Sequence, residues 1–332
     1  MNRPEASNPT HPSRRDVILL GIGAFAVTAT PVLLRSRRVL TRRRVAVMGT
    51  IGEIAVVHRD PRYAHQAIDA AIEQLRLVDC TMTRFAASSD VGRANLRAAA
   101  EPTSIADMTA TVIEEGIRWA ESSDGAFDPC IGRAVKLWDV THRQEPPPAK
   151  DVQRFAQRGL YRRLDLDAKR GRAVVRFTDD DVQLDLGGIA KGYGVDRAVE
   201  ALREWGIERA LVNVGGDLYA MGESEDGDPW KVGIRSAANP SKIARTLEIA
   251  DQAVATSGDY LQFFRYRDRR YHHLLDPVTG EPRVSSAHSV TVTAHSCMTA
   301  DAAATAVFGM ARSRAEGLVR VRAPEARVVH SA

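Results

Sequence analysis

Segments with the two-residue period of β-strands and segments with the 3.6-residue period of α-helices follow one another along residues 45–332. Residues 45–57 alternate as a strand that is interrupted at the sequence MGT, residues 48–50. Residues 64–80 and 107–122 instead place apolar side chains three and four positions apart, which indicates amphipathic helices. The order contains no strict strand–helix–strand repeat and no internal repeat. We therefore expect a single α+β domain with mixed sheets and packed helices, rather than a doubly wound parallel sheet.

Several shorter segments extend this pattern. Strand-like alternation is found at residues 172–186, 210–222, 230–235 and 245–250, and helical periodicity at residues 192–206. The strand at residues 210–222 runs into a glycine turn. The sequence VATSGDY, residues 254–260, is rich in hydroxyl groups, and we expect a tight turn there.

One carboxylate stands in an alanine-rich segment near the carboxyl end, TADAAATAVFGM at residues 299–310. Alanine is the strongest helix former, so this segment is expected to be a closely packed helix. Asp301 and Thr305 are four residues apart and would lie on the same face of that helix. They could be a carboxylate near a helix end with an unrelated threonine, or two oxygen ligands for a hard cation. The segment alone leaves both interpretations open.

Residues 1–44 are interpreted as a leader. Ser13, Arg14 and Arg15 precede 18 uncharged residues, 17–34, and this pattern is typical of a twin-arginine export signal. A run of that length could also span a bilayer, so a membrane anchor is the alternative. With either interpretation, the domain that begins at residue 45 is expected outside the cytoplasmic membrane.

The basic residues of this chain are concentrated in that leader. Residues 1–44 hold nine arginines and two acidic residues, a net charge of +7, and the whole chain carries +4, so residues 45–332 carry −3. No basic patch interleaved with aromatic residues is present, which argues against nucleic-acid binding. Cys80, Cys130 and Cys297 form no CxxC pair, so neither a zinc site nor a thioredoxin-like motif is supported.

Two further segments carry groups that can do chemistry. Residues 185–202, DLGGIAKGYGVDRAVEAL, are interpreted as a strand that passes through glycines into the start of a helix. Such a turn offers backbone N–H groups to an anion, and Lys191 adds a positive charge. The segment matches neither the Walker A pattern nor GxGxxG. Residues 271–282, YHHLLDPVTGEP, add two histidines and a carboxylate at a Pro/Gly turn, where a histidine could be catalytic or structural.

These segments follow one another in the order MGT, GAFDP, DLGGIAKGY, VNVGGD, TSGDY, HHLLDPVTG and ADAAATA. With this set the chain resembles the ApbE family of flavin transferases over roughly residues 45–315. The resemblance implies an enzyme that binds FAD and cleaves its pyrophosphate with Mg²⁺. Such enzymes attach FMN through its phosphate to a Thr or Ser of an acceptor flavoprotein and release AMP. Members of the family are commonly exported, which agrees with the leader.

The resemblance also implies roles for residues of this chain. Asp301, Thr305 and the backbone carbonyl of Gly188 are the implied Mg²⁺ ligands. His273 is the implied general base for the acceptor hydroxyl, because a neutral imidazole can take that proton near pH 7. The implied FAD contacts are Met48, Phe85, Ala126, Phe127, Asp128, Asp185, Lys191 and Leu274. Among these, Asp185 is expected at the adenosine end of FAD and Lys191 at a phosphate.

The chain departs from the family pattern after its GAFDP motif. Cys130 replaces a usual Thr, residues 133–134 (Arg-Ala) replace Pro-Leu, and Asp139 replaces a Gly. These changes bear on the shape of the flavin pocket and on the choice of acceptor. Two other functions stay open: an FAD pyrophosphatase that gives FMN and AMP, and a non-enzymatic FAD-binding protein. The expected partners of a transferase are FAD and an exported or membrane-bound acceptor flavoprotein.

Overall fold

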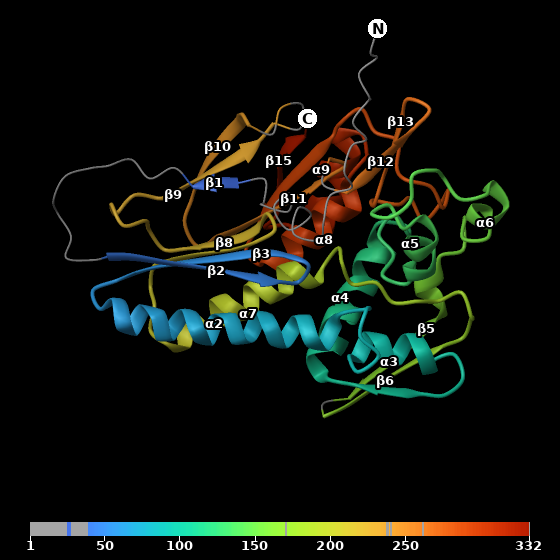
Figure 1. Ribbon diagram of the computed structural model, residues 1–332, viewed down its shortest axis with the longest axis horizontal. Helices are drawn as coiled ribbons and strands as arrows, with labels where there is room; N and C mark the ends of the chain where they lie inside the picture. Colours follow the sequence, from blue (N-terminus) through green and yellow to red (C-terminus); the bar gives the residue numbers. More distant parts are fainter. Residues whose placement is uncertain are drawn as a thin grey trace, which may run out of the picture.

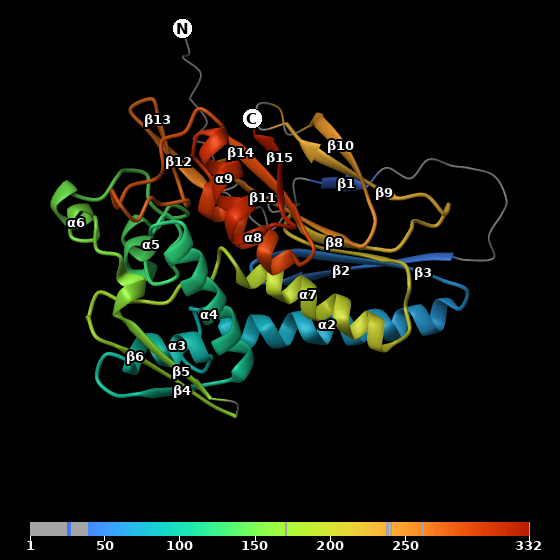
Figure 2. The ribbon, with the colours of Figure 1, turned by 180° about the vertical axis from the view of Figure 1, so that it is seen from behind.

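Figure 1 shows the computed structural model, which describes residues 25–27, 39–169, 171–236, 239, 241–260 and 262–331. A seven-stranded sheet lies in the middle, in the order β15-β14-β11-β8-β7-β3-β2. Helices pack on one face of this sheet, and a three-stranded sheet in the order β1-β9-β10 lies on the other side (Figures 1 and 2).

The strands of the main sheet are β2 (Val39–Val47), β3 (Thr50–His58), β7 (Ala210–Val214), β8 (Asp217–Met221), β11 (Gln252–Gly258), β14 (Ser289–Ala294) and β15 (Arg327–Ser331). The helices on its face are α2 (Pro61–Met82), α7 (Ala190–Glu204) and α8 (Cys297–Val307), and α9 (Arg312–Arg322) follows α8. The small sheet consists of β1 (Phe25–Val27), β9 (Trp230–Arg235) and β10 (Ile243–Ile249).

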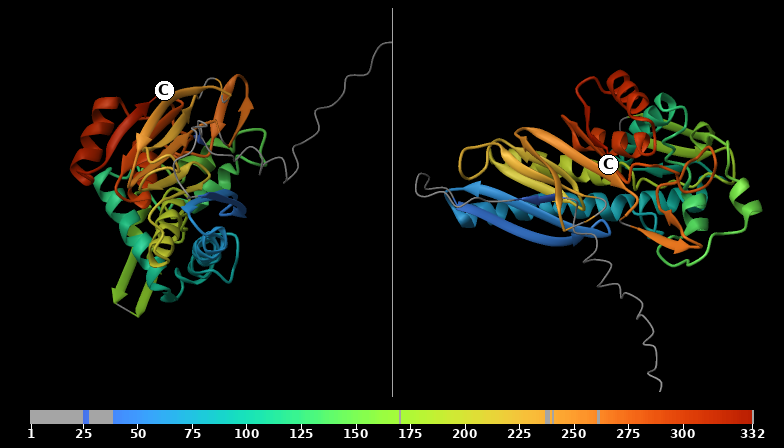
Figure 3. Two further views of the ribbon diagram at one scale, coloured as in Figure 1. Left: turned by 90° about the vertical axis from the view of Figure 1, so that its left-hand side faces the viewer. Right: turned by 90° about the horizontal axis from the view of Figure 1, so that it is seen from above.

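The remaining elements gather at one end of the main sheet, as the right-hand view of Figure 3 shows. The helical ones are α3 (Asp90–Arg97), α4 (Asp107–Ser122), α5 (Gly132–Trp138), α6 (Ala149–Gln153) and the 3₁₀ turn η1 (Leu160–Arg163). A small sheet contains β4 (Thr103–Ile105), β5 (Leu164–Lys169) and β6 (Arg172–Phe177), and a hairpin contains β12 (Phe263–Tyr266) and β13 (Arg269–His272). Helix α5 and the residues on either side of this hairpin help to line the candidate site described below.

The main sheet is buried on both faces because its strands carry apolar residues on both sides. In β3, Ile54 and Val56 join the core under the helices, whereas Ala55 and Val57 join a second core against the small sheet. Successive side chains of a strand point to opposite faces, so this split follows directly from the run of apolar residues.

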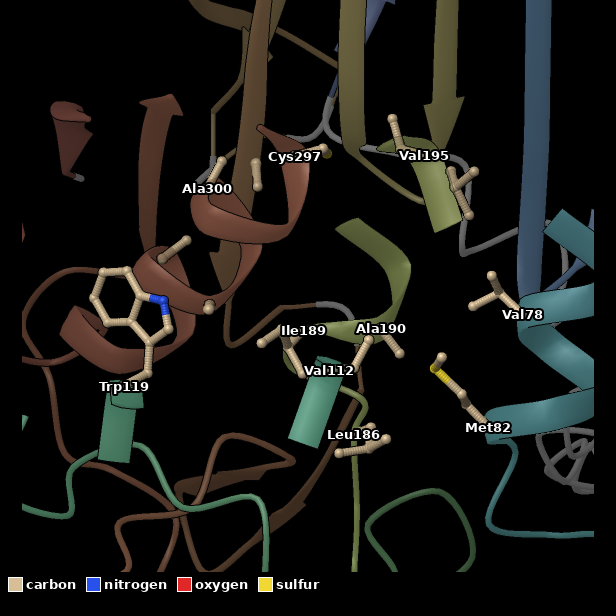
Figure 4. Packing of buried hydrophobic residues seen from close by; sticks show 14 of the residues in the cluster. Val78, Met82, Val112, Trp119, Leu186, Ile189, Ala190, Val195, Cys297 and Ala300 are labelled. Atoms are coloured by element: carbon tan, nitrogen blue, oxygen red, sulfur yellow. The ribbon is translucent and has the colours of Figure 1, made fainter. Parts of the chain in front are cut away.

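The start of α7 lies deep in the helical layer. Figure 4 shows Ile189 and Ala190 among Met82 of α2, Val112 of α4 and Ala300 of α8. Small residues let α7 and α8 approach closely: a Cβ at Gly192 would lie 2.3 Å from the carbonyl oxygen of Cys297. Asp196 of α7 also accepts the backbone N–H groups of Cys297 and Met298 at 2.7 and 2.9 Å. The alanine-rich helix is therefore fixed against the segment that contains Lys191.

The α+β class is confirmed, and most predicted elements are present. Helix α4 spans the predicted residues, and the MGT segment is the turn between β2 and β3. Two predictions were wrong. Residues 254–260 are not a turn, because most of them lie in β11, whose Val254 and Ala255 are buried between β8 and β14. The strand predicted at 172–186 ends at Phe177, and the DLGG segment follows a loop rather than a strand.

Two strands of the structure lie at least partly within residues 1–44, the predicted leader: β1 pairs with β9 in the small sheet, and β2 begins at Val39. Residues 39–44 therefore belong to the edge of the main sheet. Arg43 pairs there with Asp69, and Arg44 with Glu53 at 2.5 Å. Charged side chains such as these arginines disfavour the pairing of an edge strand with another chain. In the sequence, the same arginines look like the end of a basic leader. Residues 1–24 and 28–38 lie outside the described residues. In the part of the chain that is described, no helix has the length and apolar character to cross a bilayer.

Candidate active site

A cleft lies where α5 meets the hairpin β12–β13. It is lined by Arg84, Val135, Trp138, Asp139, Val140, Thr141, Gln262, His273 and Leu275, and its volume is about 320 Å³, part of it open to solvent. Trp138 fixes α5 to the hairpin: its Nε1 donates to the Gly280 carbonyl at 2.7 Å, and its ring stacks on Tyr271 at 5.6 Å between centroids. Asp139 adopts φ 32° at the end of α5, a left-handed conformation in which Asp is tolerated better than most residues. The structure therefore shows why a glycine could be replaced by Asp at this position.

His273 lies in the wall of this cleft, directly after β13. Its backbone N–H donates to the Gln262 carbonyl at 3.2 Å, and its Nδ1 is 3.4 Å from the same oxygen. Donation from Nδ1 leaves Nε2 as the nitrogen that can accept a proton. Burial and the neighbouring His272 lower the pKa of His273 to about 4. The imidazole is therefore neutral at pH 7, as a general base must be.

The preceding histidine has a different environment. His272 is buried, with Nε2 2.9 Å from the Arg283 carbonyl and Nδ1 accepting the Leu274 N–H at 3.2 Å. Burial lowers the pKa of His272 as well. Because both of its nitrogens bind backbone groups, His272 fits a structural role, and it orients the chain on either side of His273. Leu274, a predicted FAD contact, is half-buried beside it.

Two further predicted FAD contacts, Phe85 and Asp185, are joined by a residue that the sequence analysis missed. Arg84 Nε lies 3.1 Å from Asp185 Oδ2, and the Arg84 guanidinium lies 4.4 Å from the centroid of the Phe85 ring. The Phe85 side chain is 84% exposed, so an aromatic face is open to a flat ring from solution. Arg84 also lines the cleft with His273. The structure thus brings this group to the candidate base.

Lys191 lies in the first turn of α7 between two buried carboxylates. Its Nζ contacts Asp217 at the start of β8 and lies 3.3 and 3.4 Å from the two oxygens of Asp301 on α8. Although burial alone would lower the pKa of Lys191, the two carboxylates raise it above its ordinary value, so the ammonium stays charged. Burial and the nearby Asp217 raise the pKa of Asp301. Asp301 also accepts the Gly192 N–H at 3.0 Å, at the positive end of α7.

The predicted metal ligands converge on the connection that leads into α7. Asp301 reaches residues 191–192, and Thr305, one turn further along α8, reaches Gly188. A Cβ at Gly188 would lie 3.1 Å from Thr305 Oγ1, which also lies 3.2 Å from Ser257 Oγ. Within the described residues no cluster of three or more His, Cys, Asp or Glu side chains could hold a metal. A sparse set of oxygen donors fits Mg²⁺, which usually keeps waters and takes substrate phosphates.

The other predicted FAD contacts lie around this connection. The sulfur of Met48 lies near Gly194 of α7, and its N–H donates to Asp79 at 2.8 Å. Phe127 is buried and touches the Gly188 position. Asp128 is also buried, and its carboxylate accepts the N–H groups of Cys130 and Tyr161 at 2.8 and 3.2 Å. Burial raises the pKa of Asp128 to about 6. These bonds fit a role in shaping the GAFDP loop.

Arg283 ties three segments of the site together. Its Nη1 donates to the carbonyls of residues 305, 306 and 308 at 3.0, 3.1 and 2.6 Å. Its Nε donates to the Leu275 carbonyl at 3.1 Å, and its Nη2 donates to the Ala126 carbonyl. The end of α8, the loop after His273 and the GAFDP loop therefore share one guanidinium.

Replacing Arg283 with Met is expected to lower the free energy of unfolding by about 2–4 kcal/mol, because several carbonyls lose a charged donor. Three of these carbonyls lie at the end of α8, where no intrahelical partner is available. Arg283→Lys keeps the charge but not the fork of donors and should be intermediate. Urea unfolding of the three proteins measures this, and a change below about 0.5 kcal/mol for Arg283→Met would contradict the role.

Among the residues of this site that were not predicted from the sequence are Arg84, Asp217, Ser257, Gln262 and Arg283. Arg84 precedes the predicted FAD contact Phe85, and Asp217 and Ser257 stand inside the VNVGGD and TSGDY motifs. Gln262 and Arg283 gave no such signal. Their roles depend on contacts with segments far away in the chain.

Comparisons with known proteins agree with this geometry. The model of the ApbE family matches residues 48–329. FAD:protein FMN transferase of Treponema pallidum is 32% identical over 295 residues, covering 84% of this chain and 81% of that protein. FAD:protein FMN transferase of Vibrio cholerae is 31% identical over 272 residues, covering 80% of each.

Solved structures give the same result. The ApbE protein of Thermotoga maritima has a TM-score of 0.75 and 30% identity, over 83% of this chain and 90% of that one. Flavin transferase ApbE of Vibrio cholerae has a TM-score of 0.73 and 29% identity, over 86% and 91%. The family match includes every segment of the candidate site, and sequence and fold agree. The chain belongs to the ApbE family.

Proposed function

We propose that this protein is a magnesium-dependent FAD:protein FMN transferase, which attaches FMN through its phosphate to a Thr or Ser of an acceptor flavoprotein. The flavin transferase activity follows from membership of the ApbE family and from relatives named FAD:protein FMN transferase. The observation that supports the site is the cleft in which neutral His273 lies with Arg84, the partner of Asp185.

The reaction breaks one phosphoanhydride bond of FAD and forms one phosphoester bond to the acceptor hydroxyl. His273 Nε2 takes the hydroxyl proton, and AMP leaves with the electron pair of the broken P–O bond. Phe85 and Arg84 offer a stacking face and a positive charge to FAD, and Lys191 offers an ammonium to a phosphate. Asp301, Thr305 and the Gly188 carbonyl would hold Mg²⁺. Bound there, Mg²⁺ would neutralise the pyrophosphate oxygens and the leaving AMP.

The products formed from FAD test this function against the two alternatives. With FAD, Mg²⁺ and an acceptor flavoprotein, a transferase releases AMP without an equal amount of free FMN. An FAD pyrophosphatase, with water in place of the acceptor, releases AMP and FMN in equal amounts whether or not the acceptor is present. A non-enzymatic FAD-binding protein leaves FAD unchanged. Chromatography of the nucleotides at several time points distinguishes the three.

The proposed location is the outer side of the cytoplasmic membrane, where an exported or membrane-bound flavoprotein would be the acceptor. The twin arginine and the apolar run of residues 17–34 support this proposal. The twin arginine and most of the apolar run lie outside the residues that the structure describes. Replacing Arg14 and Arg15 with Lys should leave the protein in the cytoplasm, because the export receptor reads the arginine pair itself and not only its charge. Cell fractionation measures this, and normal export of the double-Lys form would contradict it.

A further inference from the structure

The cluster of Lys191, Asp217 and Asp301 joins three elements at the proposed metal site. Lys191 comes from α7, Asp217 from the start of β8 and Asp301 from α8. The two carboxylates are almost completely buried, at 2% and 3% exposure. Two carboxylates and one ammonium leave the ionised cluster with a net charge of −1, which attracts a further cation.

The ammonium is not shared equally. Lys191 Nζ makes its close contact with Asp217, whereas its distances to the Asp301 oxygens are 3.3 and 3.4 Å. The attraction between charges weakens with distance, so the pair with Asp301 is the easier one to separate. A metal that binds Asp301 therefore needs to displace only the weaker of the two contacts.

We propose that Asp217 is a positioning residue, which keeps the Lys191 ammonium on itself and so leaves the Asp301 carboxylate available to a divalent cation. Without Asp217, the ammonium has Asp301 as its only carboxylate partner in the cluster and competes with the metal for it. With Asp217, Lys191 stays in the site after the metal binds, where it can contact a phosphate. This inference rests on the proposed Mg²⁺ requirement and concerns the same site.

Mg²⁺ affinity measured by calorimetry without FAD at pH 8 tests the proposal, with Mn²⁺ binding followed by electron paramagnetic resonance as a second measurement. The proteins compared are the parent, Asp217→Asn, Lys191→Met and the double variant. Asp217→Asn is expected to weaken Mg²⁺ binding about 10-fold, the lower end for residues behind the ligands. Lys191→Met is expected to tighten it, because the competing ammonium is gone.

The double variant separates positioning from simple charge. If Asp217 acts through Lys191, adding Asp217→Asn to Lys191→Met should change the Mg²⁺ affinity less than about threefold. The matched control is Glu200→Gln, which removes a carboxylate from α7; Glu200 is exposed and pairs with Arg197 on the same helix. That control should keep Mg²⁺ affinity within about threefold of the parent. Circular dichroism melts of all variants check folding.

Three results would overturn the proposal. If Asp217→Asn weakens Mg²⁺ binding equally whether residue 191 is Lys or Met, Asp217 acts by its own charge and not through Lys191. No effect of Asp217→Asn on Mg²⁺ or Mn²⁺ affinity, or a parent that binds neither ion, would also exclude it. The proposed function is tested separately by the transfer assay. If the parent binds Mg²⁺ with the expected coupling between Asp217 and Lys191 but forms no flavinylated acceptor, this inference stands and the proposed function is wrong.

Discussion

Replacing Asp301 with Asn is expected to lower the rate of FMN transfer by about 10²- to 10³-fold at a Mg²⁺ concentration that saturates the parent. Asn keeps the shape of the side chain and can still accept the Gly192 N–H, a bond of 3.0 Å in the parent. Lys191 retains its contact with Asp217. The variant should therefore fold but lack the negative charge that attracts the cation. The deficit should shrink as Mg²⁺ is raised, because higher concentration offsets weaker binding.

Thr305→Val provides the comparison on the same helix face. It keeps the shape of Thr305 and removes the hydroxyl that lies 3.2 Å from Ser257 Oγ. We expect a smaller loss, about tenfold, because a neutral ligand contributes less than a full charge. Transfer rates against Mg²⁺ concentration are measured for both variants, with thermal melts as a control. If the Mg²⁺ dependence of both equals that of the parent, the metal site is excluded and Asp301 is only a cap for α7.

Replacing His273 with Ala is expected to slow FMN transfer by about 10²- to 10⁴-fold, the usual contribution of a general base. FAD binding should change little, because in the proposed reaction the imidazole acts on the acceptor hydroxyl. His142→Ala is the matched control, since His142 follows the cleft residue Thr141 and its Nδ1 pairs with Asp139. It should keep nearly the parental rate. Transfer at the parental rate by His273→Ala would mean that the base lies elsewhere.

The pH dependence of transfer gives an independent test of His273. Its pKa is lowered to about 4, so the imidazole is neutral and active above that pH and is protonated below it. The parental rate should therefore fall as pH decreases below about 5, with a midpoint near 4. A midpoint near 6.5, the ordinary pKa of histidine, would contradict the buried environment. His273→Ala should lack this decrease.

Protein stability must be followed in the same pH range. His272 and His273 have lowered pKa values in the fold, whereas unfolded histidines take up protons near pH 6.5. The unfolded state then binds more protons, so their contribution to stability is complete above pH 6.5 and is lost as pH decreases toward 4. Melts at each pH show whether a lower rate reflects protonation of the base or unfolding.

Local patterns predicted the elements whose sequence and environment agree. Helix α4 was predicted at its observed bounds because its apolar residues repeat at helical spacing on one buried face. The break at Met48 was predicted from the MGT segment, whereas the antiparallel pairing of the strands on either side of it was not. Where a segment is polar yet buried, the prediction failed. Strand β11 was taken for a turn because Thr256 and Ser257 bear hydroxyls, which in the fold pair with Thr291 and Thr305.

The contacts that build the site could not be predicted from local sequence. Lys191 lies 110 positions from Asp301, and its closer partner Asp217 comes from a third element. Arg283 looks like an ordinary surface residue in the sequence, and its role depends on carbonyls from three separate segments. The resemblance to a family supplied residue identities for the site. The fold alone shows which of them are already bonded to protein groups, as Asp128 is.

Flavin transfer is measured as the mass of a purified acceptor flavoprotein after incubation with this protein and FAD in the presence of Mg²⁺ or of EDTA. The acceptor should gain the mass of one FMN, less one water, with Mg²⁺ and should gain nothing with EDTA. An acceptor whose modified Thr is replaced by Val should stay unchanged. An acceptor of unchanged mass, in a reaction with Mg²⁺ where FAD is consumed to FMN and AMP, would contradict the proposed transferase function.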